Sequence, residues 1–599
     1  MGNIVLVQIA APKDPADLYT RMAYVRENHW KLTHLLNYNQ TFYKHDIGML
    51  LGFEEERFVK RTTDTAKLGL IDSSVGDSSS ATTPSSIGGT GEEFTSRSYF
   101  GRINYAFDSR YLFEVNMRYD GSSRFAPDNR WGLFPSFSAG WRISEERFMK
   151  GLPIDNLKLR ASWGKLGNNA IGNYEWQAVY NSAKYAFGGS LNNGLAITSI
   201  SNNLLEWEST AITNIGIDFA TLRNRLTFEA EFYNKVTDGI LYRPDMYMSL
   251  GTASGPRQNI AEVTNRGIEM TLNWQDRIGK VEYRVSGNFA YNQNKVSKYK
   301  GELQRGWVTD ENGNRVYQTN IGDVSTGGST RVIEGKMINE YYMLQPYKGS
   351  GNGFNADGTV NINGGPRDGM IRTVDDMKWL NAMVGAGDKF YPRQNVSKSG
   401  IWYGDYIYAD LNGDGVYGND ADNEFQGCSN VPKYNFGLQA SANWKGFDFS
   451  MNWSGAAGFK IYYYRLALNS SATIKGYAIG EAIANDHYFF DPKNPNDPRT
   501  NLSSKNPRLT NNSGNDQSGM TQSSVHLQKG DYIKLKNLTI GYTLPAVLSK
   551  KVYAQNIRFF ASGENLFTIT GYEGMDPEMR TAVGYSTMRQ YAFGVNITF

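Results

Sequence analysis

One stretch of the chain has the residue types and spacing of a calcium-binding loop. The segment YADLNGDGVYGNDADNEF covers residues 408–425, and its oxygen-bearing side chains alternate at Asp410, Asn412 and Asp414, followed by Gly415. An EF-hand-type loop opens in this way, because alternate oxygens converge on the ion and the glycine permits a sharp turn. The pattern predicts a site for Ca²⁺, which would be the only cofactor.

The end of the same segment departs from that pattern. The twelfth position of an EF-hand loop carries a bidentate glutamate, and here it is Ala421. Asp420, Asp422 or Glu424 would have to supply the missing oxygens, and Asp420 is taken as the fourth ligand. The competing interpretation is a polar turn that binds no ion.

Aromatic residues in the long segment 293–433 could bind a substrate. Flat apolar rings stack well on sugar rings. The candidate substrate-binding residues are Trp307, Trp379, Trp402, Tyr403 and Tyr406. For any single one of them, packing within the segment or against a partner protein is the simpler interpretation, because surface aromatics are common.

Catalysis has little support in the sequence. The five histidines show no metal-ligand spacing, and there is no G-x-S-x-G elbow or Walker loop. The acidic pair Glu229 and Glu231 resembles glycosidase carboxylates only superficially, because such residues recur on many predicted strands. We therefore expect a protein that is not an enzyme.

Composition narrows the class further. The 62 Lys and Arg residues are nearly balanced by 59 Asp and Glu, so the chain lacks the positive field of a nucleic-acid binder. The single cysteine, Cys428, excludes an intramolecular disulfide. No apolar run approaches the roughly 20 residues of a transmembrane helix. A transmembrane β-barrel escapes this test, because only alternate residues of its strands face lipid.

Alternation of apolar and polar residues recurs along the chain and predicts an all-β fold. In YLFEVNMRYD, for example, Phe113, Val115 and Met117 share one face, while Glu114 and Arg118 lie on the other. Fifteen strands are predicted. They lie near 29–43, 46–57, 98–107, 110–119, 133–142, 157–167, 207–219, 225–236, 263–274, 281–292, 434–444, 447–456, 531–544, 556–566 and 588–599.

The connections between these strands alternate between short and long. The large loops are 58–97, 293–433 and 457–530, and residues 83–91 within the first read as a flexible polar stretch. In an up-and-down sheet every second connection lies on the same rim. Short periplasmic turns and long extracellular loops are the asymmetry of an outer-membrane barrel.

The last strand carries the same pattern to the end of the sequence. Tyr591, Phe593, Val595, Ile597 and Phe599 alternate with small or polar residues. The apolar face is expected to meet lipid. Tyr591, Phe593 and the terminal Phe599 are similar to the C-terminal signal that outer-membrane barrels present to the barrel-assembly machinery.

Several long blocks of the chain resemble the SusC/RagA family of TonB-dependent outer-membrane transporters. The similarity runs from about residue 29 to the end. The blocks include YFGRINYAFDSRYLFEVNMRYDGSSRFAPDNRWGLFPSFSAGWRISEERFM (99–149), NLKLRASWGKLGNNAIGNY (156–174), LEWESTAITNIGIDFATLRNRLTFEAEFYNKVTDGILY (205–242), NIAEVTNRGIEMTLNW (259–274) and ENLFTITGYEGMDPE (564–578).

The resemblance implies a transmembrane antiparallel up-and-down β-barrel in the outer membrane. It implies TonB-dependent uptake of oligosaccharides or peptides together with a SusD-like surface lipoprotein. A family barrel has about 22 strands, so the 15 or 16 recognised here would form a partial one. Residues 1–28 read as a truncated start with a possible strand, and 29–599 as the C-terminal part of the barrel. No plug domain is recognised before residue 29, so TonB is expected to act through an N-terminal plug region absent from this sequence.

A second class of function remains open at the level of sequence. A soluble, secreted, β-rich carbohydrate-binding protein or glycoside hydrolase would also have many strands and surface aromatics. Such folds have no reason to sort their loops by length, and they usually contain Greek-key connections. The alternating loop lengths therefore favour the outer-membrane barrel.

Overall fold

A computed structural model describes most of the chain. The described residues are 18–70, 77–242, 257–299, 307–309, 315–317, 330–331, 335–391, 395–463, 484–509, 523–580, 585 and 587–599.

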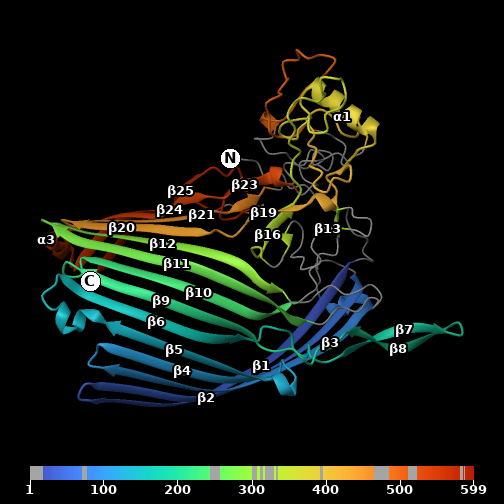
Figure 1. Cartoon of the computed structure of the whole chain (residues 1–599). Helices are drawn as coiled ribbons and strands as arrows, with labels where there is room; N and C mark the ends of the chain where they lie inside the picture. The colour runs from blue at the N-terminus through green and yellow to red at the C-terminus, as the bar shows by residue number, and fades with distance from the viewer. Residues whose placement is uncertain are drawn as a thin grey trace. The chain divides into compact units, whose positions relative to one another are not determined.

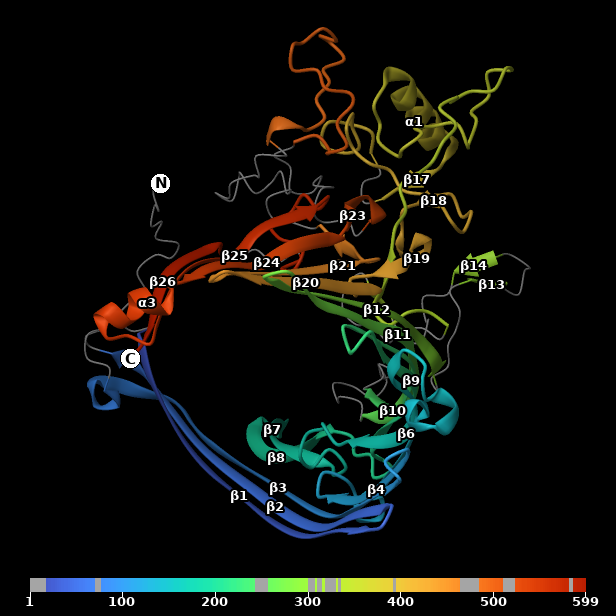
Figure 2. The ribbon, with the colours of Figure 1, turned by 90° about the vertical axis from the view of Figure 1, so that its left-hand side faces the viewer.

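Fifteen strands form one antiparallel sheet in which sequence neighbours are spatial neighbours (Figures 1 and 2). The fifteen predicted strands are all present. They are β1 (Tyr19–Phe42), β2 (His45–Leu70), β3 (Ala81–Phe107), β4 (Tyr111–Ser122), β5 (Trp131–Arg142), β6 (Ile154–Asn168), β9 (Glu208–Thr221), β10 (Leu226–Tyr242), β11 (Gln258–Ile278), β12 (Val281–Tyr299), β20 (Tyr434–Trp444), β21 (Phe447–Ala457), β24 (Tyr532–Thr543), β25 (Asn556–Thr570) and β26 (Gln590–Thr598).

The first three strands are much longer than predicted. β1 has 24 residues, β2 has 26 and β3 has 27, and β1 begins ten residues before the expected start at 29. The predicted loop 58–97 is therefore corrected: most of it continues β2 and β3, with residues 83–91 paired against β2. The apolar alternation that marked the strands stops there, although the backbone pairing continues.

Tight turns close the short connections. Lys445 and Gly446, between β20 and β21, have positive φ angles of 47° and 90°. A Cβ on Gly446 would lie 2.7 Å from the carbonyl oxygen of Thr543, so the glycine is needed for both its φ angle and its close approach to β24. Two-residue turns of this kind match the twist of an antiparallel pair.

The long connections contain structure that the sequence did not predict. A hairpin of β7 (Val179–Phe187) and β8 (Ser190–Ser199) and the helix α1 (Val374–Ala386) are the largest additions. A single-turn helix, α3 (Ala546–Ser549), lies in the short connection between β24 and β25. The short strands are β13 (Trp307–Thr309), β14 (Arg315–Tyr317), β15 (Thr330–Arg331), β16 (Glu340–Met343), β17 (Lys389–Phe390), β18 (Val416–Tyr417), β19 (Glu424–Ser429), β22 (Lys460–Tyr462) and β23 (Leu527–Lys529).

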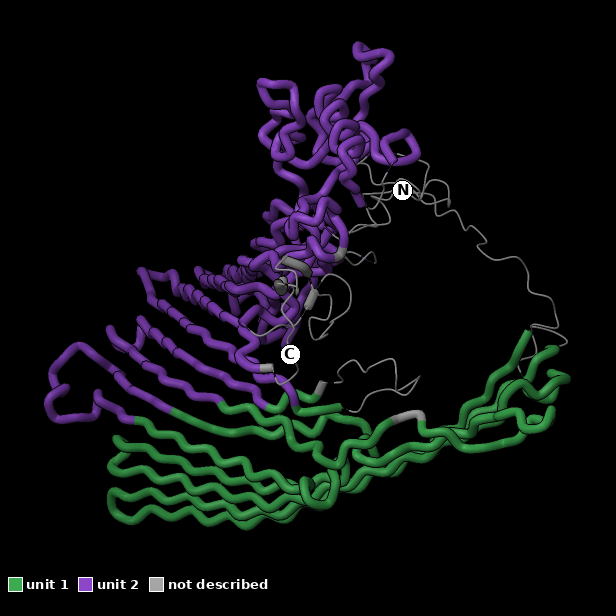
Figure 3. Tube along the Cα trace, turned by 45° about the vertical axis from the view of Figure 1, so that its right-hand side comes forward, with its two compact units in different colours: residues 1–140, 162–211, 239–259 green, residues 141–161, 212–238, 260–599 purple. Residues whose placement is uncertain are grey.

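The chain divides into two compact units (Figure 3). Unit 1 comprises residues 1–140, 162–211 and 239–259, and it contains β1–β4 and the β7–β8 hairpin. Unit 2 comprises residues 141–161, 212–238 and 260–599, and it contains β12, β20, β21, β24–β26 and α1. No helix among the described residues combines the length and apolar character that a membrane crossing would require.

Within each unit the strands expose their apolar residues. In β4 the side chains of Phe113, Met117 and Tyr119 are exposed, whereas Glu114 and Arg118 on the other face are half-buried. A soluble sheet shows the opposite arrangement, because water favours exposure of the charged face. The strands are therefore built to present an apolar face to a medium other than water.

Aromatic residues mark two levels on that exposed face in unit 1. At one level, aromatic rings from neighbouring strands lie in contact. We call this row of rings the outer belt, and its members are His34, Phe53, Tyr99, Tyr119 and Trp131. At the other level His45 and Phe107 contact, and Phe107 lies against Tyr111. In β4 the two levels, at Tyr111 and Tyr119, are eight residues apart in sequence. Strands tilted by about 40° would cover roughly 20 Å of bilayer in that length, close to the apolar band of an outer-membrane barrel.

Candidate functional site

A polar groove runs across the polar face of five strands of unit 2. It lies over β11, β12, β20, β21 and β24 and has a volume of about 560 Å³. The side chains come from two adjacent cross-strand rows, so successive strands contribute neighbouring positions. Its polar lining residues, which we call the amide groove, are Asn273, Arg284, Ser286, Gln439, Ser441, Ser450, Asn452 and Asn537.

The amide groove offers hydrogen bonds with little charge. Ser286 donates to Asn273 at 2.5 Å, and Asn273 donates onward to Thr227 at 3.1 Å. Arg284 is the one charged residue among those lining the groove. Amides and hydroxyls can both donate and accept, so the surface suits a ligand rich in hydroxyl or peptide groups.

Elsewhere on the same face of unit 2, charges are paired across strands. Arg160 forms ion pairs with Asp218 and Glu231. Arg558 binds both carboxylate oxygens of Asp448, at 2.6 and 2.8 Å. Outside the amide groove, this face of the sheet therefore carries many paired charges, whereas the groove itself carries little charge.

The long connections of unit 2 build a separate hydrophobic core around α1. The core contains Trp379, Leu380, Phe390, Ile407 and Tyr488, drawn from two connections far apart in the sequence. We call the described residues of 335–429 and 484–526 the loop module. The side chain of Trp379 is fully buried, and its indole nitrogen donates to the carbonyl oxygen of Asn361 at 2.8 Å.

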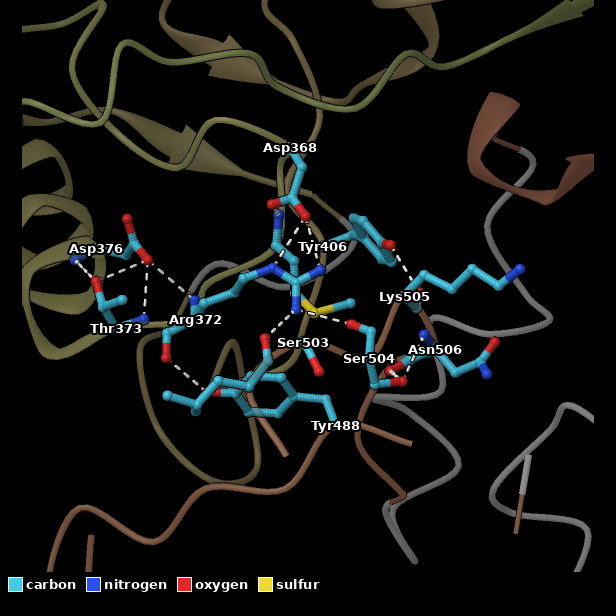
Figure 4. Close-up of polar contacts among 12 residues, drawn as sticks. Asp368, Arg372, Thr373, Asp376, Tyr406, Tyr488, Ser503, Ser504, Lys505 and Asn506 are labelled. Atoms are coloured by element: carbon cyan, nitrogen blue, oxygen red, sulfur yellow. Dashed lines mark hydrogen bonds and ion pairs between the residues drawn. The ribbon is translucent and has the colours of Figure 1, made fainter. Parts of the chain in front are cut away.

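Arg372 joins the two connections (Figure 4). Its guanidinium donates to Asp368 and to the carbonyl oxygens of Leu502 and Ser504, at 2.5 and 2.7 Å. Its own carbonyl oxygen accepts from the Tyr488 hydroxyl at 2.6 Å. The next residue, Thr373, caps α1 with Asp376 in a reciprocal capping box, which fixes the helix start beside this contact.

Arg508 makes a second, more deeply buried junction. Its guanidinium binds both carboxylate oxygens of Asp405, at 2.8 and 2.9 Å, and donates to the carbonyl oxygens of Lys398 and Gly400. Asp405 is almost completely buried. Burial raises the pKa of the Asp405 carboxyl, while its hydrogen bonds from Arg508 oppose that shift. Arg372 and Arg508 together bind the two connections into one module.

A smaller cavity of about 250 Å³ lies beside Arg508. Its lining includes Tyr406, Tyr463 and Leu527, with an ion pair between Lys505 and Glu573. Gln528 donates to Glu573 at 2.9 Å and thereby extends this polar network. The cavity combines aromatic residues with hydrogen-bonding groups, which is the usual composition of a small-ligand pocket.

Comparison with known proteins decides the family. Residues 13–566 match the family described as "TonB dependent receptor-like, beta-barrel". The chain belongs to this family. It is an outer-membrane receptor barrel, and the family is one of transporters and not of enzymes, as the sequence predicted. The soluble carbohydrate-binding protein or glycoside hydrolase is not supported.

Individual relatives agree with this assignment. The chain is 30% identical to the TonB-dependent receptor P39 of Formosa agariphila, covering 94% of this chain and 52% of the relative. It is 28% identical to the TonB-dependent receptor SusC of Bacteroides thetaiotaomicron, covering 84% of this chain and 43% of SusC. The resemblance to SusC/RagA proteins is thus confirmed. The chain spans about half the length of the curated relatives it matches.

A solved structure shows the same fold. The structure of the RagAB peptide transporter superposes with a TM-score of 0.71 at 21% identity, covering 97% of this chain and 56% of that one. This likeness supports the antiparallel up-and-down sheet.

The receptor places most of its candidate substrate-binding aromatics inside the loop module. Trp379, Tyr403 and Tyr406 are buried in its core, and Trp402 packs against that core while remaining half-buried. Trp307 lies in β13, and its side chain is outside the described part of the structure. Packing in the core is the simpler interpretation that the sequence offered for each, and Tyr406 also lines the cavity of about 250 Å³. A role of these aromatic residues in binding substrate stays a prediction.

The candidate calcium loop folds as a series of side-chain-stabilised turns. Asp410 accepts hydrogen bonds from the amides of Gly413 and Gly415, at 2.6 and 2.9 Å. Asn412 and Asp414 similarly accept from amides two residues further on. These bonds tie each of the three side chains to the backbone of the loop.

The buried carboxylate behind the loop is Asp422, and it has a different environment from the predicted ligands. It is 0% exposed and accepts from the amides of Leu411, Gly418 and Asn419. Burial raises the pKa of Asp422 to about 6, although these amide bonds favour the charged form. The Asp420 side chain lies outside the described part of the structure.

Among the described residues, no group of three or more His, Cys, Asp or Glu side chains is arranged to hold a metal ion. The calcium site therefore stays a prediction. Tyr591, Phe593 and Phe599 lie at the end of the chain with exposed side chains, on the face expected to meet lipid. Their role as an assembly signal likewise stays a prediction.

Residue pattern alone did not distinguish the residues that organise the loop module. In the sequence, Arg372, Arg508 and Asp405 look like ordinary charged residues. Arg508 and Asp405 bind each other in the fold, but they are 103 residues apart in the sequence. The capping box at Thr373 and Asp376 was the one local signal that could have revealed α1.

Proposed function

We propose that this chain forms the transmembrane wall and extracellular loops of a TonB-dependent importer of oligosaccharides or peptides. The observation that carries the proposal is the two-sided character of the strands. Within unit 2, one face exposes Leu438, Phe447 and Ile540, which suit lipid, and the other holds a polar groove of amides and hydroxyls. A wall of this kind separates lipid from a hydrated passage.

The proposed substrates follow from the chemistry of the amide groove. Oligosaccharides and peptides both present closely spaced hydroxyl or amide groups. As such a ligand moves along the groove, it can exchange hydrogen bonds with one set of side chains for hydrogen bonds with the next. The weak charge of the groove avoids holding either ligand as tightly as an ionic site would.

The proposed partners follow from the family resemblance. A SusD-like surface lipoprotein would cover the extracellular loops, and TonB would supply energy through a plug region. The name of the RagAB peptide transporter supports a peptide as one class of substrate.

Uptake by cells that carry the receptor tests the proposal. Ser441→Trp and Ser450→Trp place bulk in the amide groove and should lower the rate of uptake of a labelled oligosaccharide or peptide library at least severalfold. Leu438→Trp is the matched control, because Leu438 lies on the same strand with an exposed side chain on the apolar face. Equal uptake in all three variants, at equal surface expression, would contradict transport along this wall.

A further inference from the structure

One cross-strand row of polar side chains passes through the amide groove and continues beyond it. Each member lies directly opposite the next in the register of the sheet, and we call this set the polar row: Asn273, Ser286, Gln439, Asn452, Asn537, Glu564 and Gln590. The first five line the amide groove, whereas Glu564 of β25 and Gln590 of β26 extend the row to the last strand. Strand neighbours of the row, such as Leu438 and Tyr591, belong to the exposed apolar face.

Several members of the polar row have unused hydrogen-bonding capacity. Four side chains form no hydrogen bond or ion pair with any residue in the described part of the chain: Gln439, Asn452, Glu564 and Gln590. All four are exposed. An amide offers both donors and acceptors, and a carboxylate offers acceptors. Because these groups stand in one row, they are available together to a single ligand that extends across the strands.

The polar row is nearly uncharged, and most charges beside it are paired. Toward the short turns, Arg558 binds Asp448. Toward the long connections, Lys534 is buried and binds two carboxylates. Arg284 of the amide groove and Glu564 have no ion-pair partner among the described residues. A neutral hydroxyl group can accept from the arginine or donate to the glutamate, whereas a charged ligand is attracted by one and repelled by the other.

The spacing of the polar row restricts the kind of chain that can bind along it. Its seven strands lie side by side (Figure 2), and with about 4.8 Å between neighbouring strands the row is about 29 Å long. Groups on the same side of an extended peptide repeat about every 6.8 Å, which does not match the step between strands. A chain of 1,4-linked hexose rings repeats at a length close to that step and presents hydroxyl groups at every ring. The row therefore fits a sugar chain better than a peptide.

We propose that the polar row binds an extended, neutral, 1,4-linked hexose chain laid across the strands, with Glu564 and Gln590 as its last contacts. This inference rests on the proposed function. It adds the direction of the ligand, a preference for sugar over peptide, and two binding residues beyond the amide groove. The ligand forms hydrogen bonds with one strand after another, so each added ring gains contacts that a shorter chain lacks.

The two ends of the polar row lie at different distances from the short turns. Asn273 is five residues from the end of β11 at Ile278, whereas Gln590 is eight residues from the end of β26 at Thr598. Both of these strand ends are at the short-turn side of the sheet. A sugar chain that follows the row from β26 to β11 therefore also moves from the long connections toward the short turns, which is the direction that import requires.

Native mass spectrometry of the whole receptor, purified in detergent, tests the proposal. Three probes are added separately: a cello-oligosaccharide of six rings, one of two rings, and a neutral peptide as long as the six-ring chain. The test variant is Glu564→Ala with Gln590→Ala. The control is Asn556→Ala with Asn596→Ala, which removes two amides from the same two strands at their short-turn end. Folding of each variant is checked by the shift in gel mobility on boiling.

We expect the test variant to bind the six-ring chain about tenfold more weakly than the wild type, and the control to stay within about twofold of it. A tenfold loss equals about 1.4 kcal/mol, within the range of two hydrogen bonds. Binding of the two-ring chain should change much less in the test variant, because a short chain can occupy the part of the row that remains.

Four results would overturn the proposal. They are no binding of the six-ring chain by the wild type, equal binding of it by wild type and test variant, an equal loss in the control, and tighter binding of the peptide than of the six-ring chain.

Ser441→Trp, measured alongside, separates this inference from the proposed function. If Ser441→Trp weakens binding of the probes and the test variant does not, the amide groove still binds ligand, and only the direction across the strands is wrong. If Ser441→Trp leaves binding unchanged as well, the groove itself is not the site, and the proposed function loses its support too.

Discussion

The strands of unit 2 that belong to the large sheet, which we call the strand wall, and the loop module use the same residue types in opposite ways. Trp444, at the end of β20, is 48% exposed, whereas Trp379 in α1 is fully buried. Conversely, Asp448 and Arg558 pair on the half-buried face of the wall, and α1 presents Asp375 and Lys378 to solvent. The difference reflects the surrounding medium. Apolar residues face outward where the medium is lipid and inward where it is water.

The largest expected effect is in the loop module, at the buried ion pair. Arg508→Ala should lower the stability of the module by about 3–5 kcal/mol, because it leaves the buried carboxylate of Asp405 without its cation. Limited proteolysis of the folded receptor should show rapid cutting in residues 395–429 and 484–509, with the strand wall intact.

Arg499→Ala is the matched control for that prediction. It lies in the same connection, and its guanidinium, which pairs with Asp497, is exposed, so proteolysis should change little. If both variants were cut at the same rate, the junction at Arg508 would not hold the module together.

The next effect distinguishes the two faces of the wall. Phe113→Arg or Phe449→Arg should cost about 2–4 kcal/mol in denaturant unfolding from phospholipid bilayers, because each places a charge on the face that meets lipid. The same change at Asn116 or Ser450, on the polar face, should be mild. Equal costs on both faces would mean that the apolar face packs against protein.

A smaller effect is expected at the start of α1. Thr373→Ala removes the side-chain oxygen that accepts from the amide of Asp376, and should cost about 1 kcal/mol. Hydrogen exchange should quicken in the first turn of the helix. Lys378→Ala on the exposed face of α1 serves as the control, and faster exchange there as well would argue against a specific role for the cap.

The smallest structural effect is expected in the candidate calcium loop. Calorimetry on the folded receptor should detect Ca²⁺ binding in the millimolar range or tighter, and Asp410→Ala with Asp414→Ala should abolish it. Both side chains already stabilise the loop through backbone amides, so the variant should also loosen residues 408–425 without calcium. If calcium releases no heat with the wild type, the segment is a turn only.

The sequence predicted the wall well because lipid imposes a simple pattern. Wherever a strand crosses the apolar band, alternate residues must be apolar, as in Phe113, Val115 and Met117. Beyond the belt both faces meet water, so β3 could include Thr83 to Gly91 without any alternation to reveal it. The hydrogen bonds between strands persist there, but backbone pairing leaves little trace in residue type.

The loop module was not predicted because its contacts are distant in the sequence. Asp405 and Arg508 are 103 residues apart, and only the folded chain brings them together. The aromatic residues of 293–433 were recognised as a group, but residue type alone does not separate a ring that binds a ligand from one that fills a core. Trp379 and Tyr406 belong to the core.

Labelling of intact cells tests most directly whether the wall separates an outer surface from an inner one. In a Cys428→Ser background, Asp375→Cys places a thiol on the exposed face of α1, and Lys445→Cys places one in the turn between β20 and β21. A membrane-impermeant maleimide should label position 375 on intact cells, and position 445 only after the outer membrane is permeabilised. Labelling of position 445 on intact cells would contradict the transmembrane arrangement.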